Sequence, residues 1–374
     1  MRIAQVAPLF ESVPPKLYGG TERVVHWLTE ELVDLGHDVT LFASGDSATR
    51  ARLVPGAPRS LRLDQGCMDQ MAHHFVMLER VFGSWRQFDL IHFHVDYIHY
   101  PLSRRYRVPH VTTLHGRLDI PDLVPLYQEF SEVPVVSISD AQRKPLPWLN
   151  WMDTVYHGFP RHLYSLNERP GNYLAFLGRV SPEKGLDRAI RIALRAGVEI
   201  KIAAKVDRAD KEYFETVIRP LLSEPGVEFI GEIGQREKGD FLGNALALIF
   251  PIDWPEPFGL VMIEAMACGT PTLAFPNGSV PEVIRDGVAG IICHSVEQAA
   301  ECLAGVAALS RRECRKTYEK RFTSERMASD YLRIYTRVIE RHAQTPQRAV
   351  RGRPGRDLEE PRLVPDPGNL VPSA

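Results

Sequence analysis

The stretch YLAFLGRVSPEKGLDRAIRIALRAGVEIKIAAKV, residues 173–206, contains the pattern of a strand, a helix and a second strand. The apolar runs at its two ends are typical of buried strands, and the run GLDRAIRIALRAG between them has the spacing of an amphipathic helix. Such a unit predicts two parallel strands joined by a crossover helix. The stretch therefore places this part of the chain in the α/β class.

The same alternation of strands and helices extends in both directions. Towards the C-terminus, a helix is predicted over 208–222, and strand patterns recur at 227–233, near 247–252, at 270–276 and at 289–293; towards the N-terminus they occur at 3–6, 38–44, 88–94, 110–116 and 133–139. A helix is predicted after Thr21, its expected N-cap, and ends near Gly36. The turn-rich run ERPGN (168–172) separates the two series.

We therefore predict two Rossmann-like domains with parallel sheets that face each other across a cleft. The N-terminal domain spans 1–160, and the C-terminal domain spans 170–320. The helical stretch 324–342 packs back against the first domain. Residues 344–374 are rich in Pro, Arg and Gly and are predicted to be a disordered tail.

Composition excludes several classes of protein. A chain of 374 residues with 44% hydrophobic and 25% charged residues is typical of a globular protein with two domains. Its formal net charge of −2 gives no support for nucleic-acid binding. The five cysteines form no C-x-x-C pair, which argues against a zinc cage. With no signal peptide or membrane-spanning run in sight, we expect a cytoplasmic protein and leave peripheral membrane contact open.

Two glutamates stand out in DWPEPFGLVMIEAMACGTPT, residues 253–272. Pro257 suits a first helical turn, which predicts Glu256 at the mouth of a helix and Glu264 about 12 Å further along it. Two solvated glutamates on an amphipathic helix would be the simpler interpretation. However, Glu264 lies within an apolar run, and a buried carboxylate needs a partner or a ligand. The pair could bind two ends of a long polar ligand, with phosphate near the amides of 258–260.

A second group of polar residues is basic. In LGRVSPEKGLD (177–187), Arg179 follows a strand, Ser181 is a potential N-cap and Lys184 falls in the predicted first helical turn. Cations at a helix N-terminus suggest that an anion such as a diphosphate binds there, although a solvated charged turn is an equal alternative. Gly19 and Gly20 open the first helix without a G-x-G-x-x-G pattern. His92, His94 and His115 follow strands, and no acidic cluster completes a metal site around them.

Taken together, GGTERVV, TLHG, GRVSPEKG and EPFGLVMIEAMACGTPT…GSVPEVI resemble the retaining glycosyltransferase family that includes glycogen synthases, mannosyltransferases and sucrose-phosphate synthases. The resemblance spans about 1–342 and is more specific in the second half. It implies the GT-B fold and transfer of a sugar from a nucleotide-diphosphate sugar, with a UDP-sugar as the leading donor. It implies no metal and no further cofactor. YHGF (156–159) replaces the family's usual asparagine-glycine turn at the hinge.

The resemblance also implies roles for single residues. Glu264 would hold the donor ribose, and Glu256 would face the donor sugar together with the amides of Phe258, Gly259 and Leu260. Arg179 and Lys184 would neutralise the leaving diphosphate. Gly19 and Gly20 would approach that phosphate, and His115 would reach the sugar from the other domain. The implied catalytic residues are thus Arg179, Lys184, Glu256 and His115.

Other functions remain open from the sequence. A nucleotide-sugar 2-epimerase shares the architecture but needs no acceptor, and a non-catalytic nucleotide-sugar-binding protein is a further alternative. The missing G-x-G-x-x-G pattern disfavours an NAD-dependent oxidoreductase. The acceptor stays open between a polysaccharide, a lipid-linked sugar and a small metabolite, because the loops expected at 8–20, 46–75 and 117–130 match no known pattern. The oligomeric state is not predicted.

Overall fold

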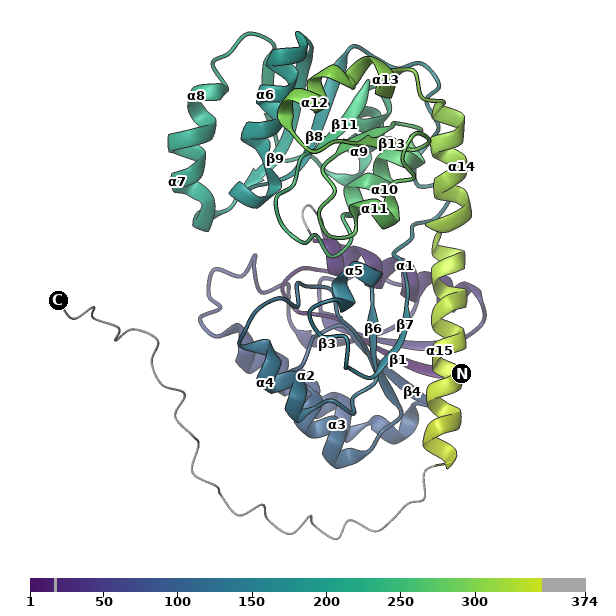
Figure 1. Ribbon diagram of the computed structural model, residues 1–374. Coiled ribbons are helices and arrows are strands. Elements are labelled where there is room, and N and C mark those ends of the chain that lie inside the picture. Colours follow the sequence, from purple (N-terminus) through teal and green to yellow (C-terminus); the bar gives the residue numbers. More distant parts are fainter. Residues whose placement is uncertain (17–18, 345–374) are drawn as a thin grey trace, which may run out of the picture.

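The computed structural model describes residues 1–16 and 19–344. Two open α/β domains are stacked one above the other, as Figure 1 shows. The predicted fold class, two Rossmann-like domains with parallel sheets, is confirmed. The tail predicted at 344–374 lies almost wholly outside the described residues.

The first sheet has seven parallel strands in the order β3-β2-β1-β4-β5-β6-β7. The strands are β1 (Arg2–Val6), β2 (Asp38–Ser44), β3 (Arg52–Ala57), β4 (Leu90–Phe93), β5 (His110–Thr113), β6 (Val135–Ser137) and β7 (Trp151–Thr154). Its helices are α1 (Gly20–Asp34), α2 (Gln70–Gly83), α3 (Tyr100–Tyr106), α4 (Leu123–Glu129) and α5 (Asp140–Arg143). The strand order reverses between β1 and β4, and ligands of such sheets bind beside that reversal.

The second sheet has six parallel strands in the order β10-β9-β8-β11-β12-β13. They are β8 (Tyr173–Val180), β9 (Glu199–Val206), β10 (Val227–Gly231), β11 (Ala247–Phe250), β12 (Thr272–Ala274) and β13 (Gly290–Ile292). The helices around them are α6 (Leu186–Ala196), α7 (Lys211–Tyr213), α8 (Arg219–Leu221), α9 (Gln235–Gly243), α10 (Leu260–Ala267), α11 (Val280–Val283), α12 (Val296–Glu301) and α13 (Leu303–Ala307). The central strands are buried on both faces, as their apolar runs require.

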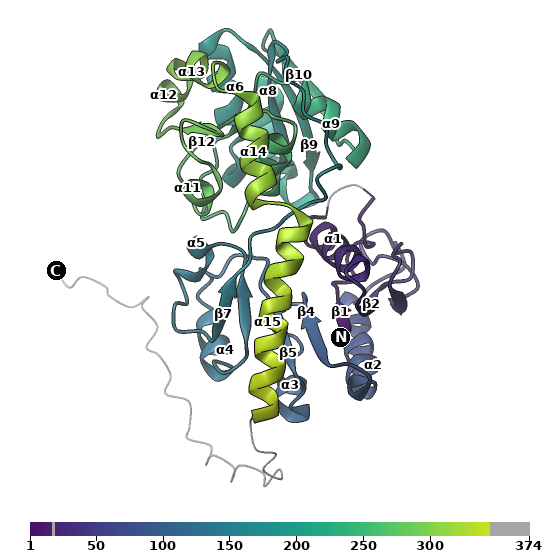
Figure 2. The same ribbon diagram turned by 90° about the vertical axis from the view of Figure 1, so that its right-hand side faces the viewer.

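Two C-terminal helices connect the domains on one side. Helix α14 (Arg311–Arg321) packs beside α10, and α15 (Ser324–Gln344) runs along the first domain (Figures 1 and 2). Tyr331 and Tyr335 of α15 are fully buried in the same core as Val24 and Leu28 of α1. The first domain therefore contains a helix that comes from the far end of the described chain.

The chain crosses between the domains twice at one place. Phe159 on the first crossing exchanges backbone hydrogen bonds with Phe322 (3.1 Å) and Ser324 (2.8 Å) on the second. A Cβ atom on Gly158 would lie 2.2 Å from the carbonyl oxygen of Thr323, so only glycine permits this approach. Nearby, the Glu282 carboxylate accepts hydrogen bonds from the Asp140 and Ala141 amides of the other domain, at 2.8 and 2.6 Å.

Several local predictions are wrong. The loop expected at 46–75 contains β3 and the start of α2, and the loop expected at 117–130 contains α4. By contrast, the helix expected over 208–222 is confirmed, since the chain is helical without a break from Arg208 to Leu221, as consecutive 3-10, α and π segments. Helix α1 begins at Gly20, and its N-cap is Gly19 rather than Thr21. The predicted stop is confirmed, because Gly36 has a φ of 80° just past the helix.

Candidate functional site

A cleft of about 520 Å³ lies between the carboxyl ends of the two sheets, and side chains from both domains line it. The structure brings all ten predicted site residues into its lining: Gly19, Gly20, His115, Arg179, Lys184, Glu256, Phe258, Gly259, Leu260 and Glu264. Sequence positions up to 245 residues apart therefore meet at one place. This location is where two open α/β sheets are expected to bind a ligand.

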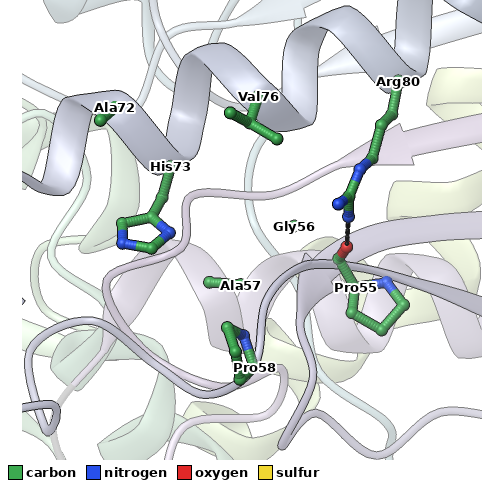
Figure 3. Close-up of a pocket in the computed structure, with 8 residues that line it drawn as sticks. All are labelled: Pro55, Gly56, Ala57, Pro58, Ala72, His73, Val76 and Arg80. Atoms are coloured by element: carbon green, nitrogen blue, oxygen red, sulfur yellow. Dashed lines mark hydrogen bonds between the residues drawn. The ribbon is translucent and has the colours of Figure 1, made fainter.

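A second hollow lies on the first domain, between β3 and α2 (Figure 3). Its lining is mostly apolar, and Arg80 of α2 closes one end by donating a 2.6 Å hydrogen bond to the carbonyl oxygen of Pro55. It shares no described lining residue with the cleft. None of the predicted site residues lies there, so the cleft is the candidate site.

Glu256 is not on a helix, which corrects the prediction for the glutamate pair. It lies in the loop after β11, and α10 begins only at Leu260, with Gly259 at its N-cap in the left-handed conformation (φ 77°). The predicted helical spacing between Glu256 and Glu264 therefore does not apply. The loop is held by its backbone: Ser279 N–H donates to the Glu256 carbonyl at 2.9 Å. A Cβ on Gly278 would lie 2.2 Å from the Glu256 nitrogen, so glycine allows this contact.

The Glu256 carboxylate is buried and has two donors. Lys184 Nζ forms an ion pair with its Oε2 atom, and Trp254 Nε1 donates to the same oxygen at 2.9 Å. The Lys184 ammonium also lies 4.7 Å from the centroid of the Trp254 ring. Lys184, Trp254 and Glu256 thus form one compact cluster on the cleft wall.

Glu264 is also buried, as predicted, and Lys238 is the cationic partner that a buried carboxylate needs. Lys238 Nζ lies 2.9 Å from its Oε1 atom, and Tyr164 OH donates to the same atom at 3.0 Å. Burial pushes the pKa of Glu264 upward, but the charges of Lys238 and Arg23 and these hydrogen bonds outweigh it. The pKa of Glu264 therefore lies below its usual range, and the group is a carboxylate at neutral pH.

Arg179 and Lys184 lie close to the predicted places, with one correction. Arg179 is near the end of β8, where its guanidinium donates to Glu183 at 2.5 Å and lies 3.6 Å from Asp210. Lys184 ends a separate 3-10 turn, Pro182–Lys184, and α6 begins only after Gly185 at φ 71°. Ser181 makes no N-cap hydrogen bond through its side chain. Both cations nonetheless face the cleft.

The opposite wall is built from histidines. His115 Nε2 lies 2.9 Å from His94 Nδ1, and His94 Nε2 lies 2.8 Å from the amide oxygen of Gln5. Burial lowers the pKa of His115 to about 3 and that of His94 well below its usual value, so both are neutral at pH 7. His92, which is fully buried, contacts Tyr335 of α15 instead of the cleft. Within residues 1–16 and 19–344, no three His, Cys, Asp or Glu side chains are grouped as a metal site would need.

The glycine pair lies where the two domains meet. Gly20 is the first residue of α1, and a Cβ there would lie 3.5 Å from the Leu260 side chain at the start of α10. The N-termini of α1 and α10 therefore approach each other across the cleft. This leaves backbone amides of both domains beside the same space.

Two family models match the chain. The model described as "Glycosyl transferases group 1" matches residues 165–323, and "Glycosyltransferase Family 4" matches residues 18–160. Residues 165–323 therefore match a group 1 glycosyltransferase domain, and residues 18–160 match a glycosyltransferase family 4 domain. The two matches correspond to the second and first sheets, so each wall of the cleft falls within a recognised glycosyltransferase domain.

Single proteins agree with this assignment. A D-inositol 3-phosphate glycosyltransferase from Geodermatophilus obscurus is 28% identical over 201 residues, covering 48% of this chain and 43% of that protein. The chain thus matches less than half the length of this curated relative. AviGT4, a glycosyltransferase involved in avilamycin A biosynthesis, has a TM-score of 0.71 at 23% identity, covering 91% of this chain and 98% of its own.

A third comparison concerns a structure with ligands. Anabaena HepE in complex with UDP and glucose has a TM-score of 0.70 at 18% identity, covering 90% of this chain and 100% of that one. At such identities the likeness establishes the fold, which is the GT-B fold of glycosyltransferases.

Sequence reasoning missed several residues of this candidate site. Lys238 and Tyr164 bind Glu264 from distant segments, and nothing in their local sequence indicates this. Trp254 stands two residues before Glu256, and that proximity was an available signal. Arg117 reaches across from the first domain, with its guanidinium carbon 5.9 Å from the centroid of the Trp254 ring. Asp96, an acid without an assignable role in the sequence, lines the cleft.

The described part of the chain contains no helix that combines the length and the apolar character needed to cross a bilayer.

Proposed function

We propose that the chain transfers a sugar from a nucleotide-diphosphate sugar to an acceptor hydroxyl, with retention of configuration at the anomeric carbon. One observation carries this proposal: two cations, Arg179 and Lys184, and two buried carboxylates, Glu256 and Glu264, converge on one wall of the cleft. Cations suit a diphosphate, and carboxylates suit the hydroxyls of ribose and sugar. A UDP-sugar is the leading donor, since HepE, of the same fold, binds UDP and glucose.

In this proposal the donor binds along α10. Glu264, on the helix, accepts hydrogen bonds from the ribose hydroxyls. The diphosphate lies near the N-terminus of α10, where the backbone amides of Gly259 and Leu260 favour negative charge. Gly20, on the facing helix, leaves room for it. His115, neutral at pH 7, faces the sugar from the other wall.

Binding of the diphosphate would exchange partners within the cluster. In the structure, Lys184 is paired with Glu256. A diphosphate offers Lys184 more negative charge, so the ammonium would turn towards it and leave Glu256 Oε2 with room for one further donor. Trp254 would still donate to Glu256 and hold its orientation. The released oxygen could then accept a hydrogen bond from a hydroxyl of the donor sugar.

The transfer step breaks the bond between the anomeric carbon and the diphosphate oxygen. The acceptor oxygen forms the new bond on the same face of the sugar, and its proton passes to the departing phosphate. Arg179 and Lys184 stabilise the charge that develops on the diphosphate, which is electrostatic preorganisation. Glu256 is held by two donors at one oxygen and is assigned to sugar binding rather than to nucleophilic attack.

The test combines binding with product analysis. Calorimetry should detect binding of one of UDP, GDP and ADP to the wild type, and Glu264→Gln should weaken it at least about tenfold, as expected for lost bonds to a charged group. Glu301→Gln, an exposed change on α12 of the same domain, serves as the matched control. Absence of binding of all three nucleotides to folded protein would contradict the proposal.

Product analysis then separates the alternatives. With the matching nucleotide sugar, NMR should show a product whose anomeric configuration equals that of the donor. Inversion would exclude the retaining mechanism. Conversion of the donor without any acceptor, to its 2-epimer, would favour an epimerase, and binding without turnover would favour a non-catalytic protein.

A further inference from the structure

Asp96 holds an unusual position on the first-domain wall of the cleft. It follows the end of β4 by three residues, lines the cleft and has an exposed side chain. Its backbone φ of 50° is in the left-handed region, which residues other than glycine seldom adopt. Asp and Asn tolerate this region better than other side chains, and such outliers concentrate at ligand-binding sites. The backbone therefore holds this carboxylate in place at some cost in strain.

The Asp96 carboxylate has no partner among the residues that the structure describes. No hydrogen bond or ion pair joins the Asp96 side chain to any residue in the described part of the chain. Water reaches the group, yet the surrounding walls raise its pKa to about 6. At neutral pH it is thus an ionised acceptor of hydrogen bonds that faces the cleft. The glutamates of the opposite wall differ, because each is already paired with a lysine.

The two cations on this wall already have partners. Among the described lining residues of the first domain, the cations are Arg23 and Arg62. Arg62 forms a 3.1 Å ion pair with the buried Glu11, and Arg23 donates to the side chain of Gln235. His94 and His115 are neutral. Both cations of the described first-domain lining are therefore engaged, whereas the Asp96 carboxylate is left to accept hydrogen bonds from a ligand.

We propose that Asp96 anchors the acceptor through hydroxyl groups, and that the acceptor is a neutral polyhydroxy compound, a sugar or cyclitol without phosphate. A carboxylate accepts hydrogen bonds from neighbouring hydroxyls, whereas it repels a phosphate at the same place. The curated relatives are named for an inositol 3-phosphate acceptor, so this chain differs from them in acceptor class. The inference rests on the proposed transferase function. There the donor occupies the second-domain wall, so the acceptor would bind at the first-domain wall.

The test measures acceptor binding in matched pairs. Ligand-observed NMR would give dissociation constants for myo-inositol and inositol 3-phosphate, and for glucose and glucose 6-phosphate. The protein would be saturated with whichever of UDP, GDP and ADP binds best. In the wild type, the unphosphorylated member of at least one pair should bind about tenfold more tightly than its phosphate, because like charges repel in a confined cleft.

Asp96→Asn should reduce that preference to about threefold or less, since it removes the charge and keeps a residue that tolerates the left-handed backbone. Nucleotide affinity should stay within about twofold in this variant, because the donor lies on the other wall. Asp122→Asn, an exposed change in the same domain and outside the cleft lining, should leave both the preference and the nucleotide affinity unchanged.

The outcomes separate the two proposals. If no nucleotide binds the wild type, the transferase function fails and this inference fails with it. If a nucleotide binds but the phosphorylated members bind equally or better, or neither pair binds, the acceptor class is wrong while the donor site stands. An unchanged preference in Asp96→Asn would remove Asp96 from the acceptor site.

Discussion

The two walls of the cleft differ in how their charged groups are arranged. On the second-domain wall, charged groups occur in pairs: Lys184 with Glu256, and Lys238 with Glu264. On the first-domain wall, buried histidines are kept neutral by their surroundings, and Asp96 stands without a partner. Paired charges can exchange partners when a charged ligand arrives. A wall that presents the Asp96 carboxylate beside neutral histidines instead favours ligands that donate hydrogen bonds.

The largest expected effect comes from removing the cation Lys184 from the second-domain wall. Lys184→Ala removes the ammonium assigned to the leaving diphosphate, so the transfer rate should fall about 10²- to 10³-fold, as for other losses of transition-state charge stabilisation. Initial rates with the matching nucleotide sugar would measure this. Lys316→Ala, an exposed lysine of α14 paired only with Glu313, should retain wild-type rates. A loss under threefold would remove Lys184 from the catalytic group.

The second expected effect concerns stability on the same wall. Lys238→Met leaves Glu264 buried without its cation, which should lower the free energy of unfolding by about 3 kcal/mol. Denaturant titration would measure it. The double variant Lys238→Met/Glu264→Gln should recover most of the loss, because no unpaired charge remains buried. Equal stability of the single and double variants would show that the pair is not coupled.

Acid should distinguish the two domains. His94 and His115 have folded-state pKa values below the ordinary 6.5, so the unfolded chain binds more protons and the first domain loses stability as pH falls below about 6.5. Glu264 also has a lowered pKa, but its contribution is lost only as pH falls below about 4.5. Hydrogen exchange at pH 5 should therefore show easier opening of β4 and β5 than of β8 and β9. Earlier opening of β8 would reverse the comparison.

The smallest expected effect concerns Trp254, which orients the Glu256 carboxylate on the second-domain wall. Trp254→Phe keeps an aromatic ring beside Lys184 and removes the hydrogen bond to Glu256. Donor affinity should fall about fivefold, the usual worth of one such bond. Glu256→Gln combined with Trp254→Phe should cost no more than Glu256→Gln alone. Strict additivity of the two changes would mean that Trp254 acts elsewhere.

The sequence predicted the fold class and the residues of the cleft well, because buried parallel strands and polar residues at their ends leave local patterns. The apolar run around Glu264 predicts that it is buried, and the structure confirms this. The predicted helical position of Glu256 is wrong, because Pro257 is as compatible with a loop as with the first turn of a helix. The left-handed conformation of Gly259 places the start of α10 after it. Lys238 and Tyr164 could not be predicted, since only tertiary packing brings them to Glu264.

The double crossing of the chain at Gly158 and Thr323 has a consequence for how such proteins can be recombined. The first domain is completed by α15, whose Tyr331 and Tyr335 fill its core and bond to its strands. In a chimera that takes only residues 1–160 from a relative, this protein's own α15 would therefore pack against a first domain with a different sequence. Exchange of the first domain between relatives requires two segments to be inherited together, one from each side of the second domain.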